Sequence, residues 1–232
     1  MNMTEKSHTS IQYEKELQDI KENLLYEGAL VEQAIEYAIQ SLLERDSDLA
    51  QSVIDHDEHI DELDEKIEEQ CIRILALRQP AAKDLRFIAT AIKVNGHLER
   101  IGDLAVNIAR RALDLNEVPP VKPYIDLPRM ADITREMVKE SLDALVREDC
   151  GLADVVRKKD EQVDNINEQI FRELLTFMME DPKTIHRALL ITQISKSLER
   201  ISDHAESVAK MVIYMVTGES VKHQGSSGDC EK

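Results

Sequence analysis

Apolar residues recur every three to four positions along most of the chain, the spacing that places side chains on one face of an α-helix. The pattern predicts six long helices, over 11–44, 47–79, 80–116, 130–148, 152–179 and 183–217. Because consecutive helices joined by short turns pack antiparallel, each set of three should form an up-down-up bundle. We therefore expect an all-α protein made of two tandem three-helix bundles.

The domain boundaries follow from the segments in which this pattern fails. The segment 117–128 is Pro-rich and predicts a linker between a first repeat, 11–116, and a second repeat, 129–217. Residues 1–10 and 218–232 are polar, and we expect both to be disordered.

Two similar twelve-residue segments, which we call the acidic phrases, indicate that the second bundle repeats the first. LERIGDLAVNIA (98–109) and LERISDHAESVA (198–209) are identical at seven of twelve positions. The second and fifth predicted helices also align without a gap at an offset of 103 residues, which pairs Asp57 with Asp160 and Asp61 with Asp164. Internal repetition of this kind predicts that a pseudo-twofold relates the two bundles.

Composition and charge limit the class of protein and the kinds of partner that it can bind. With 3% aromatic residues, no Trp and only 7 Gly, the 232-residue chain is typical of a soluble protein of long helices. The net charge of −17 and the lack of a Lys/Arg cluster argue against nucleic acid as a partner. No apolar run approaches the roughly 20 residues that span a bilayer, so we expect no membrane insertion and a cytoplasmic location.

Acidic pairs at i, i+4 spacing occur twice in each half. Such a pair projects from one face of its helix, so its two carboxylates can share a ligand. Two helices packed through their apolar faces would bring two pairs together in each half. The candidate metal ligands are Asp57, Asp61, Glu99 and Asp103 in the first half, and Asp160, Asp164, Glu199 and Asp203 in the second.

A solvated acidic face is the default interpretation of these pairs. With 46 acidic residues in the chain, random placement already gives about nine such pairs. What distinguishes the four pairs is that both motifs recur at matching places in both halves. Oxygen-only ligands suit magnesium, manganese or calcium, and multinuclear iron or zinc is an alternative.

Other polar residues near the pairs carry weaker signals. Asn107 and Ser207 lie one turn beyond Asp103 and Asp203 and are either outer-shell partners of a metal or exposed polar residues. Helical projection turns His56, His59, His97 and His204 away from the pairs, which favours surface histidines. His204, beside Asp203, is the one we retain as a possible outer-shell residue.

Catalysis has little support in the sequence. There is no phosphate-binding glycine loop, no GxSxG motif and no Cys/His nucleophile pattern. The Glu-x-x-His motif of di-iron bundles occurs only at the start of the chain. We expect no enzyme, with a carboxylate metalloenzyme or a metal-storage bundle as the alternatives.

Taken together, the repeated E/D-x-x-x-D motifs, the LERIGD phrase and RQPAAKDLR (78–86) resemble the PhoU family of phosphate-uptake regulators over about 11–217. The resemblance implies a cytoplasmic, non-enzymatic adaptor that restrains an ABC phosphate transporter, with its ATPase subunit as a partner. It also implies an adaptor that keeps a sensor histidine kinase in its repressing state. It maps multinuclear metal clusters onto the eight carboxylates named above. We also expect a homodimer.

The second half departs from the sequence motifs of this family. Ser202 and Ser207 replace the more common residues, and the segment EDPKTIHRALL lacks the QPxAxDLR motif of the first half. If Gln79, Asp84 and Arg86 contact a partner, that contact should involve the first half alone. Simple helix capping is the other interpretation of these three residues.

Overall fold

The structure, a computed structural model, describes residues 3–219, with side chains from residue 11 onward. The described residues form seven α-helices and one short 3-10 helix: α1 (Met3–Glu44), α2 (Ser47–Asp55), α3 (Asp57–Arg78), α4 (Ala82–Asn116), α5 (Asp126–Arg147), α6 (Cys150–Glu180), η1 (Pro182–Thr184) and α7 (Ile185–Thr217). The prediction of an all-α fold is confirmed. Almost all of the predicted tail, 218–232, lies outside the described residues.

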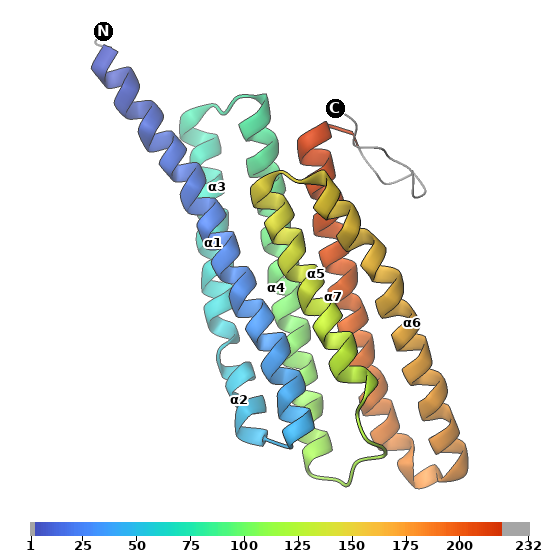
Figure 1. Ribbon diagram of the computed structural model, residues 1–232. Coiled ribbons are helices and arrows are strands. Elements are labelled where there is room, and N and C mark those ends of the chain that lie inside the picture. Colours follow the sequence, from blue (N-terminus) through green and yellow to red (C-terminus); the bar gives the residue numbers. More distant parts are fainter. Residues whose placement is uncertain (1–2, 220–232) are drawn as a thin grey trace.

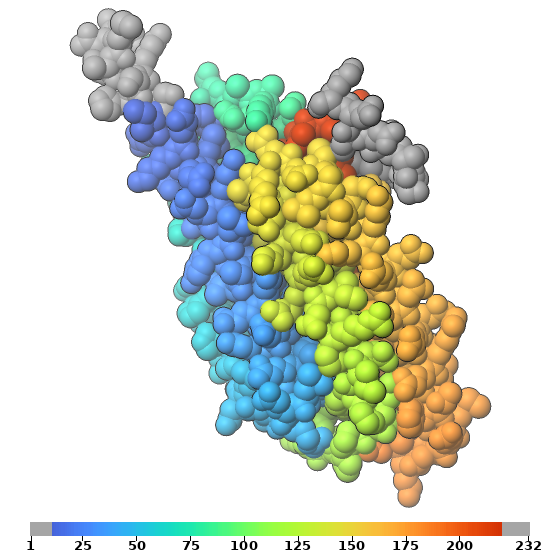
Figure 2. Space-filling view, in the orientation of Figure 1, coloured from blue at the N-terminus to red at the C-terminus, as the bar shows by residue number. Residues whose placement is uncertain are grey.

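The two halves pack side by side as antiparallel bundles (Figure 1). In the first half α1, α2 with α3, and α4 pack together, and in the second half α5, α6 and α7 do so. Contacts of α4 with α7 and of α1 with α5 join the halves into one apolar core. Figure 2 shows α1, α5 and α6 covering one face, with α4 and α7 largely hidden behind them.

The same helix cap occurs at the same place in each half. Asp46 precedes α2 and its side chain accepts a hydrogen bond of 3.0 Å from the backbone N–H of Leu49. Asp149 precedes α6 and accepts an equal bond of 3.0 Å from Leu152. Each cap contributes about 1 kcal/mol to helix stability. The repeat deduced from the sequence therefore extends to backbone detail.

The second predicted helix is not continuous, and this differs from the sequence-based expectation. His56 has φ −89° and ψ −4°, which ends α2 and starts α3 at Asp57. Apolar spacing continues across the break, so periodicity gave no sign of it. The break places Asp57 in the first turn of a helix, where the helix dipole favours a carboxylate. Its counterpart Asp160 lies in the interior of α6.

The first helix begins earlier than predicted. The expected start was residue 11, after a disordered segment, whereas α1 begins at Met3. Residues 3–10 carry no apolar stripe, so the sequence pattern had no signal for them. A helix that is already nucleated extends by one hydrogen bond per added residue, whatever the pattern.

A close approach between the halves depends on one glycine. A Cβ added to Gly28 of α1 would lie 2.0 Å from Cδ1 of Leu142 in α5. Because that distance is a clash, a larger residue would force the Leu142 side chain out of its present position.

The linker between the repeats is held in place by arginines. The loop runs over 117–125, and Pro128 lies in the first turn of α5. Arg45 donates to the carbonyls of Asn116 and Val118, and Arg187 donates to the carbonyl of Pro119. In the described part of the chain, no helix combines the length and the apolar character needed to span a bilayer.

Candidate metal centre

The first acidic site lies between α3 and α4. Asp57 and Asp61 come from the start of α3, and Glu99 and Asp103 from the middle of α4, which packs against α3. Burial raises the pKa of Asp57 to about 6, and the negative charges of Asp61 and Asp103 add to the effect. The structure thus brings the four predicted residues of the first half within each other's electrostatic reach.

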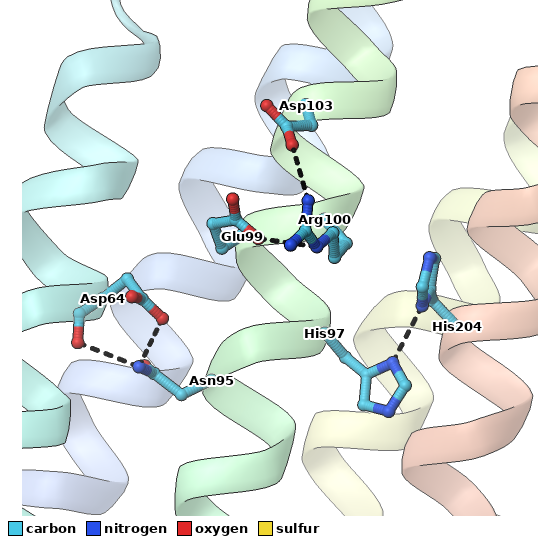
Figure 3. Close-up of polar contacts among 7 residues, drawn as sticks. All are labelled: Asp64, Asn95, His97, Glu99, Arg100, Asp103 and His204. Carbon is cyan, nitrogen blue, oxygen red and sulfur yellow. Dashed lines mark hydrogen bonds and ion pairs between the residues drawn. The ribbon is translucent and has the colours of Figure 1, made fainter.

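An exposed arginine neutralises part of this site. Arg100 Nε lies 3.2 Å from Glu99 Oε2, and its Nη1 lies 3.5 Å from Asp103 Oδ2 (Figure 3). Burial and the charge of Asp103 nevertheless raise the pKa of Glu99. Because Arg100 is 64% exposed, the pair contributes little to stability and a stronger cation could displace the arginine.

The second acidic site lies between α6 and α7. Burial raises the pKa of Asp160 to about 6, with Glu206, Asp164 and Asp203 adding to the rise and the Ser202 hydroxyl opposing it. The pKa of Asp164 and that of Asp203 are raised by burial and by the nearby Glu199. The four predicted carboxylates of the second half are therefore also neighbours.

A lysine distinguishes the second site from the first. Lys196 Nζ lies 2.5 Å from the carboxylate of Glu199, and its charge opposes the rise in the pKa of Asp164. The matching position in the first half is Gly96, at an offset of 100 residues. The second site therefore contains a positive charge of its own at a place where the first site has none.

Four further polar residues lie around the two acidic sites, and they were not predicted from the sequence. Glu206 of α7 lies near Asp160 and pairs with Lys210 at 2.6 Å. In the first half Asp64 accepts from Asn95, and the buried Glu27 of α1 lies near Asp64. Glu27 and Asn95 interrupt the apolar stripes of α1 and α4, and those interruptions were the available signal.

The donor atoms of the two acidic sites suit a hard cation, although the carboxylates do not converge on one point. Among the described residues no three His, Cys, Asp or Glu side chains stand close enough together to hold an ion. The available donors are oxygens, however, and Asp160 Oδ1 is buried without a hydrogen-bond partner among those residues. Oxygen donors suit magnesium, manganese and calcium. Coordination would require carboxylate rotation, including release of Glu99 from Arg100.

The interpretation of His97 and His204 as surface histidines was wrong. Their Nδ1 atoms lie 2.8 Å apart across the α4–α7 contact, so His204 faces His97 as Figure 3 shows. Burial lowers the pKa of His97 to about 4 and also lowers that of His204. His97 precedes Glu99 by two residues and His204 directly follows Asp203, and only the packing of one half against the other brings the rings together.

The two remaining outer-shell candidates lie one turn beyond the acidic pairs. Asn107 is exposed on α4 and Ser207 is half-buried on α7. An outer-shell role for either stays a prediction.

The residues predicted to contact a partner lie where α3 turns into α4. Gln79 ends α3 with φ 48° and ψ 64°, in the left-handed region. Asp84 accepts a 2.9 Å hydrogen bond from the Tyr13 hydroxyl, and Arg86 Nε donates to the carbonyl of Met215 at 3.0 Å. Asp84 and Arg86 therefore attach this turn to α1 and α7.

The fold and the site define a class of protein: an all-α repeat protein in which each half carries facing acidic helix pairs. Comparison with known families gives two matches to the PhoU domain, over residues 25–112 and 127–212. These matches cover most of the chain, so the chain belongs to the PhoU family.

Individual relatives agree with this membership over nearly their whole length. The chain is 44% identical to the phosphate-specific transport system accessory protein PhoU homolog of Pseudomonas putida, covering 94% of this chain and 86% of that protein. It is 45% identical to the homolog of Aquifex aeolicus, covering 90% and 95%. The crystal structure of PhoU from Pseudomonas aeruginosa matches with a TM-score of 0.86 and 44% identity, covering 89% and 100%. These names describe accessory proteins and not enzymes.

Proposed function

We propose that this protein regulates phosphate uptake as an adaptor that restrains an ABC phosphate transporter through its ATPase subunit. The same adaptor would hold a sensor histidine kinase in its repressing state when phosphate is plentiful. The observation that carries the proposal is the family membership over both repeats, together with relatives named as accessory proteins of the phosphate-specific transport system. We place the protein in the cytoplasm, as a homodimer.

The α3–α4 turn is the surface best suited to a partner. It presents Leu77, 68% exposed, and Leu85, 46% exposed, on either side of Gln79. Because Asp84 and Arg86 bond to α1 and α7, this turn is held in position. An apolar surface that is already rigid loses little entropy on binding.

The two acidic sites support a second element of the proposal, the binding of a divalent or multinuclear cation. When bound, such an ion would supply the positive charge that the crowded carboxylates lack and would link α3 to α4 and α6 to α7. The residues that would hold it are the eight carboxylates predicted from the repeat. Iron, zinc, manganese and magnesium are the candidates. The role of the ion in this proposal is structural.

A crosslinked pull-down from phosphate-replete cells tests the adaptor function. The tagged full chain should recover a phosphate-transporter ATPase and a sensor kinase, and Leu77→Lys should reduce both. Met179→Lys is the matched control, because Met179 is 83% exposed in the last turn of α6, and α6 ends at the opposite end of the bundle from the α3–α4 turn (Figure 1). Recovery of neither partner, in replete and in starved cells, would contradict the proposal. Metal uptake far beyond two sites would favour storage.

A further inference from the structure

Glu27 of α1 is a buried carboxylate without a partner. It is 0% exposed, and neither of its oxygens has a hydrogen-bond partner among the described residues. An unpaired charge in such a position is strongly destabilising, because it has lost its hydration without gaining a partner. The structure therefore needs either a proton or a cation at this place.

The packing register directs Glu27 into the seam between α3 and α4. One turn earlier on α1, Asn23 donates to Gln70 of α3 at 2.9 Å. One turn later, Leu30 lines a cavity together with Ile60 of α3. Glu27 lies between these two levels, and the charges that act on it are those of Asp64 and Glu99.

Asn95 adds a second unpartnered oxygen to this seam. Its Nδ2 donates to the Asp64 carbonyl at 2.9 Å and to the Asp64 carboxylate at 2.5 Å (Figure 3). Because Asp64 offers only acceptors, these two bonds fix the amide orientation. Asn95 is 2% exposed, and its Oδ1 has no partner in the described part of the chain.

Two cations beside these helices, Lys66 and Arg100, have partners of their own. Lys66 Nζ lies 3.3 Å from Asn23 Oδ1, and Arg100 pairs with the outer side of Glu99 and with Asp103. Burial also raises the pKa of Glu27 to about 9, with the charges of Asp64 and Glu99 adding to the rise. Both oxygens of Glu27 and Oδ1 of Asn95 are thus acceptors with no donor among the described residues.

We propose that Glu27, Asp64 and Asn95 Oδ1 bind a divalent cation between α1, α3 and α4, with Glu99 at the border of this site and the α3–α4 acidic site. Carboxylate and amide oxygens are the donors that magnesium, manganese and calcium prefer. The side chains of Asp64 and Glu99 rotate to complete the coordination, while Glu27 is already in the seam.

This site exists in the first half only. The positions matching Glu27, Asp64 and Asn95 in the second repeat are Met130, Asn167 and Ser195. Met130 and Ser195 are both fully buried. The inference rests on the proposed cation binding, because Glu99 belongs both to the α3–α4 acidic site and to the border of this new site. It does not depend on the proposed binding to the transporter or the kinase.

Calorimetric titration of the full chain with Mn²⁺ tests the site. Glu27→Gln preserves the shape of the side chain and removes its charge, so it should abolish one Mn²⁺ equivalent that the wild type binds. Asp64→Asn should lose the same equivalent, which keeps the test valid if one variant folds poorly. Glu32→Gln is the matched control on the same helix, since Glu32 faces Lys139 and Arg135, and it should bind as the wild type does.

Two outcomes separate this inference from the broader proposal. If Asp103→Asn and Asp203→Asn lose Mn²⁺ while Glu27→Gln and Asp64→Asn keep the full stoichiometry, Glu27 carries only a proton and the inference is wrong. If the wild type binds no Mn²⁺, both the inference and the proposed cation binding fail.

Discussion

The two acidic sites share their i, i+4 pairs on two packed helices and differ in charge. In the first site Arg100 is exposed, the position of Lys196 is held by Gly96, and further acidic groups extend inward to Glu27. In the second site Lys196 pairs with Glu199, and Met130 replaces the buried acid. Duplication therefore preserved the helix order, the aspartate caps and the i, i+4 pairs, but neither the continuity of the helix at His56 nor the charge balance around the pairs. We expect the first site to bind a cation more tightly.

The largest effect should come from exchanging the buried residues of α1 and α5. Met130→Glu places an acid in a fully buried position and should lower the free energy of unfolding by about 3 kcal/mol or more. Glu27→Met should raise it by about 1–3 kcal/mol in chelator, because a desolvated carboxyl is removed. Urea unfolding measures both. A loss of stability in Glu27→Met under chelator would contradict the assigned asymmetry.

The imidazole pair between the halves should make stability depend on pH. Burial lowers the pKa of His97 to about 4, so the unfolded chain binds this proton more tightly than the native protein does. Stability should therefore be complete above about pH 6.5 and decrease as the pH falls toward 4, by about 1–2 kcal/mol after allowance for solvent screening.

Unfolding of His97→Gln between pH 4 and 7 measures this contribution. The variant should show a flatter dependence on pH than the wild type, while replacement of the exposed His59 by Gln should not. An unchanged slope in His97→Gln would show that the α4–α7 contact does not exclude the protonated ring.

The lysine difference should shift cation affinity by a smaller amount. Gly96→Lys gives the first site the charge of the second, and a Cβ at Gly96 meets nothing within 4 Å. We expect Mn²⁺ affinity at the first site to fall about two- to fivefold, equivalent to about 0.5–1 kcal/mol. Gly96→Ala separates the charge from the gain in helix propensity. Equal affinities of the two variants would show that the lysine is irrelevant.

The smallest effect concerns the residue beside Asp57. A Cβ on Gly102 would lie 3.4 Å from Asp57 Oδ1 and 3.2 Å from Ile60 Cδ1, so Gly102→Ser should change stability by only about 0.5 kcal/mol. Its hydroxyl should lower the pKa of Asp57, as Ser202 does for Asp160. NMR titration of the Asp57 carboxyl measures this shift, and an unchanged pKa would contradict it.

Much of the fold could be predicted because its causes are local. The apolar spacing and the repeated acidic phrases lie within single helices, and they correspond to the observed elements. The break at His56 could not be predicted, because the apolar spacing is the same on both sides of it.

The site could be predicted only in part, for a related reason. The carboxylates on adjacent helices became visible through their repetition, whereas Glu27 and Asn95 occur once and depend on how α1 packs on α3 and α4. The His97–His204 contact depends on the packing of one half against the other. Spacing along one helix contains no information about either contact.

The most direct test of unequal cation sites is the melting temperature of the wild type, Asp103→Asn and Asp203→Asn, each in Mn²⁺ and in chelator. At a hundredfold excess over Kd, a bound ion adds about 2.7 kcal/mol of stability. We expect Mn²⁺ to raise the melting temperature of the wild type, Asp103→Asn to lose most of that rise, Asp203→Asn to lose less, and all three to melt alike in chelator. A wild type that melts at the same temperature with and without Mn²⁺ would contradict cation binding, and equal losses in the two variants would contradict the difference between the halves.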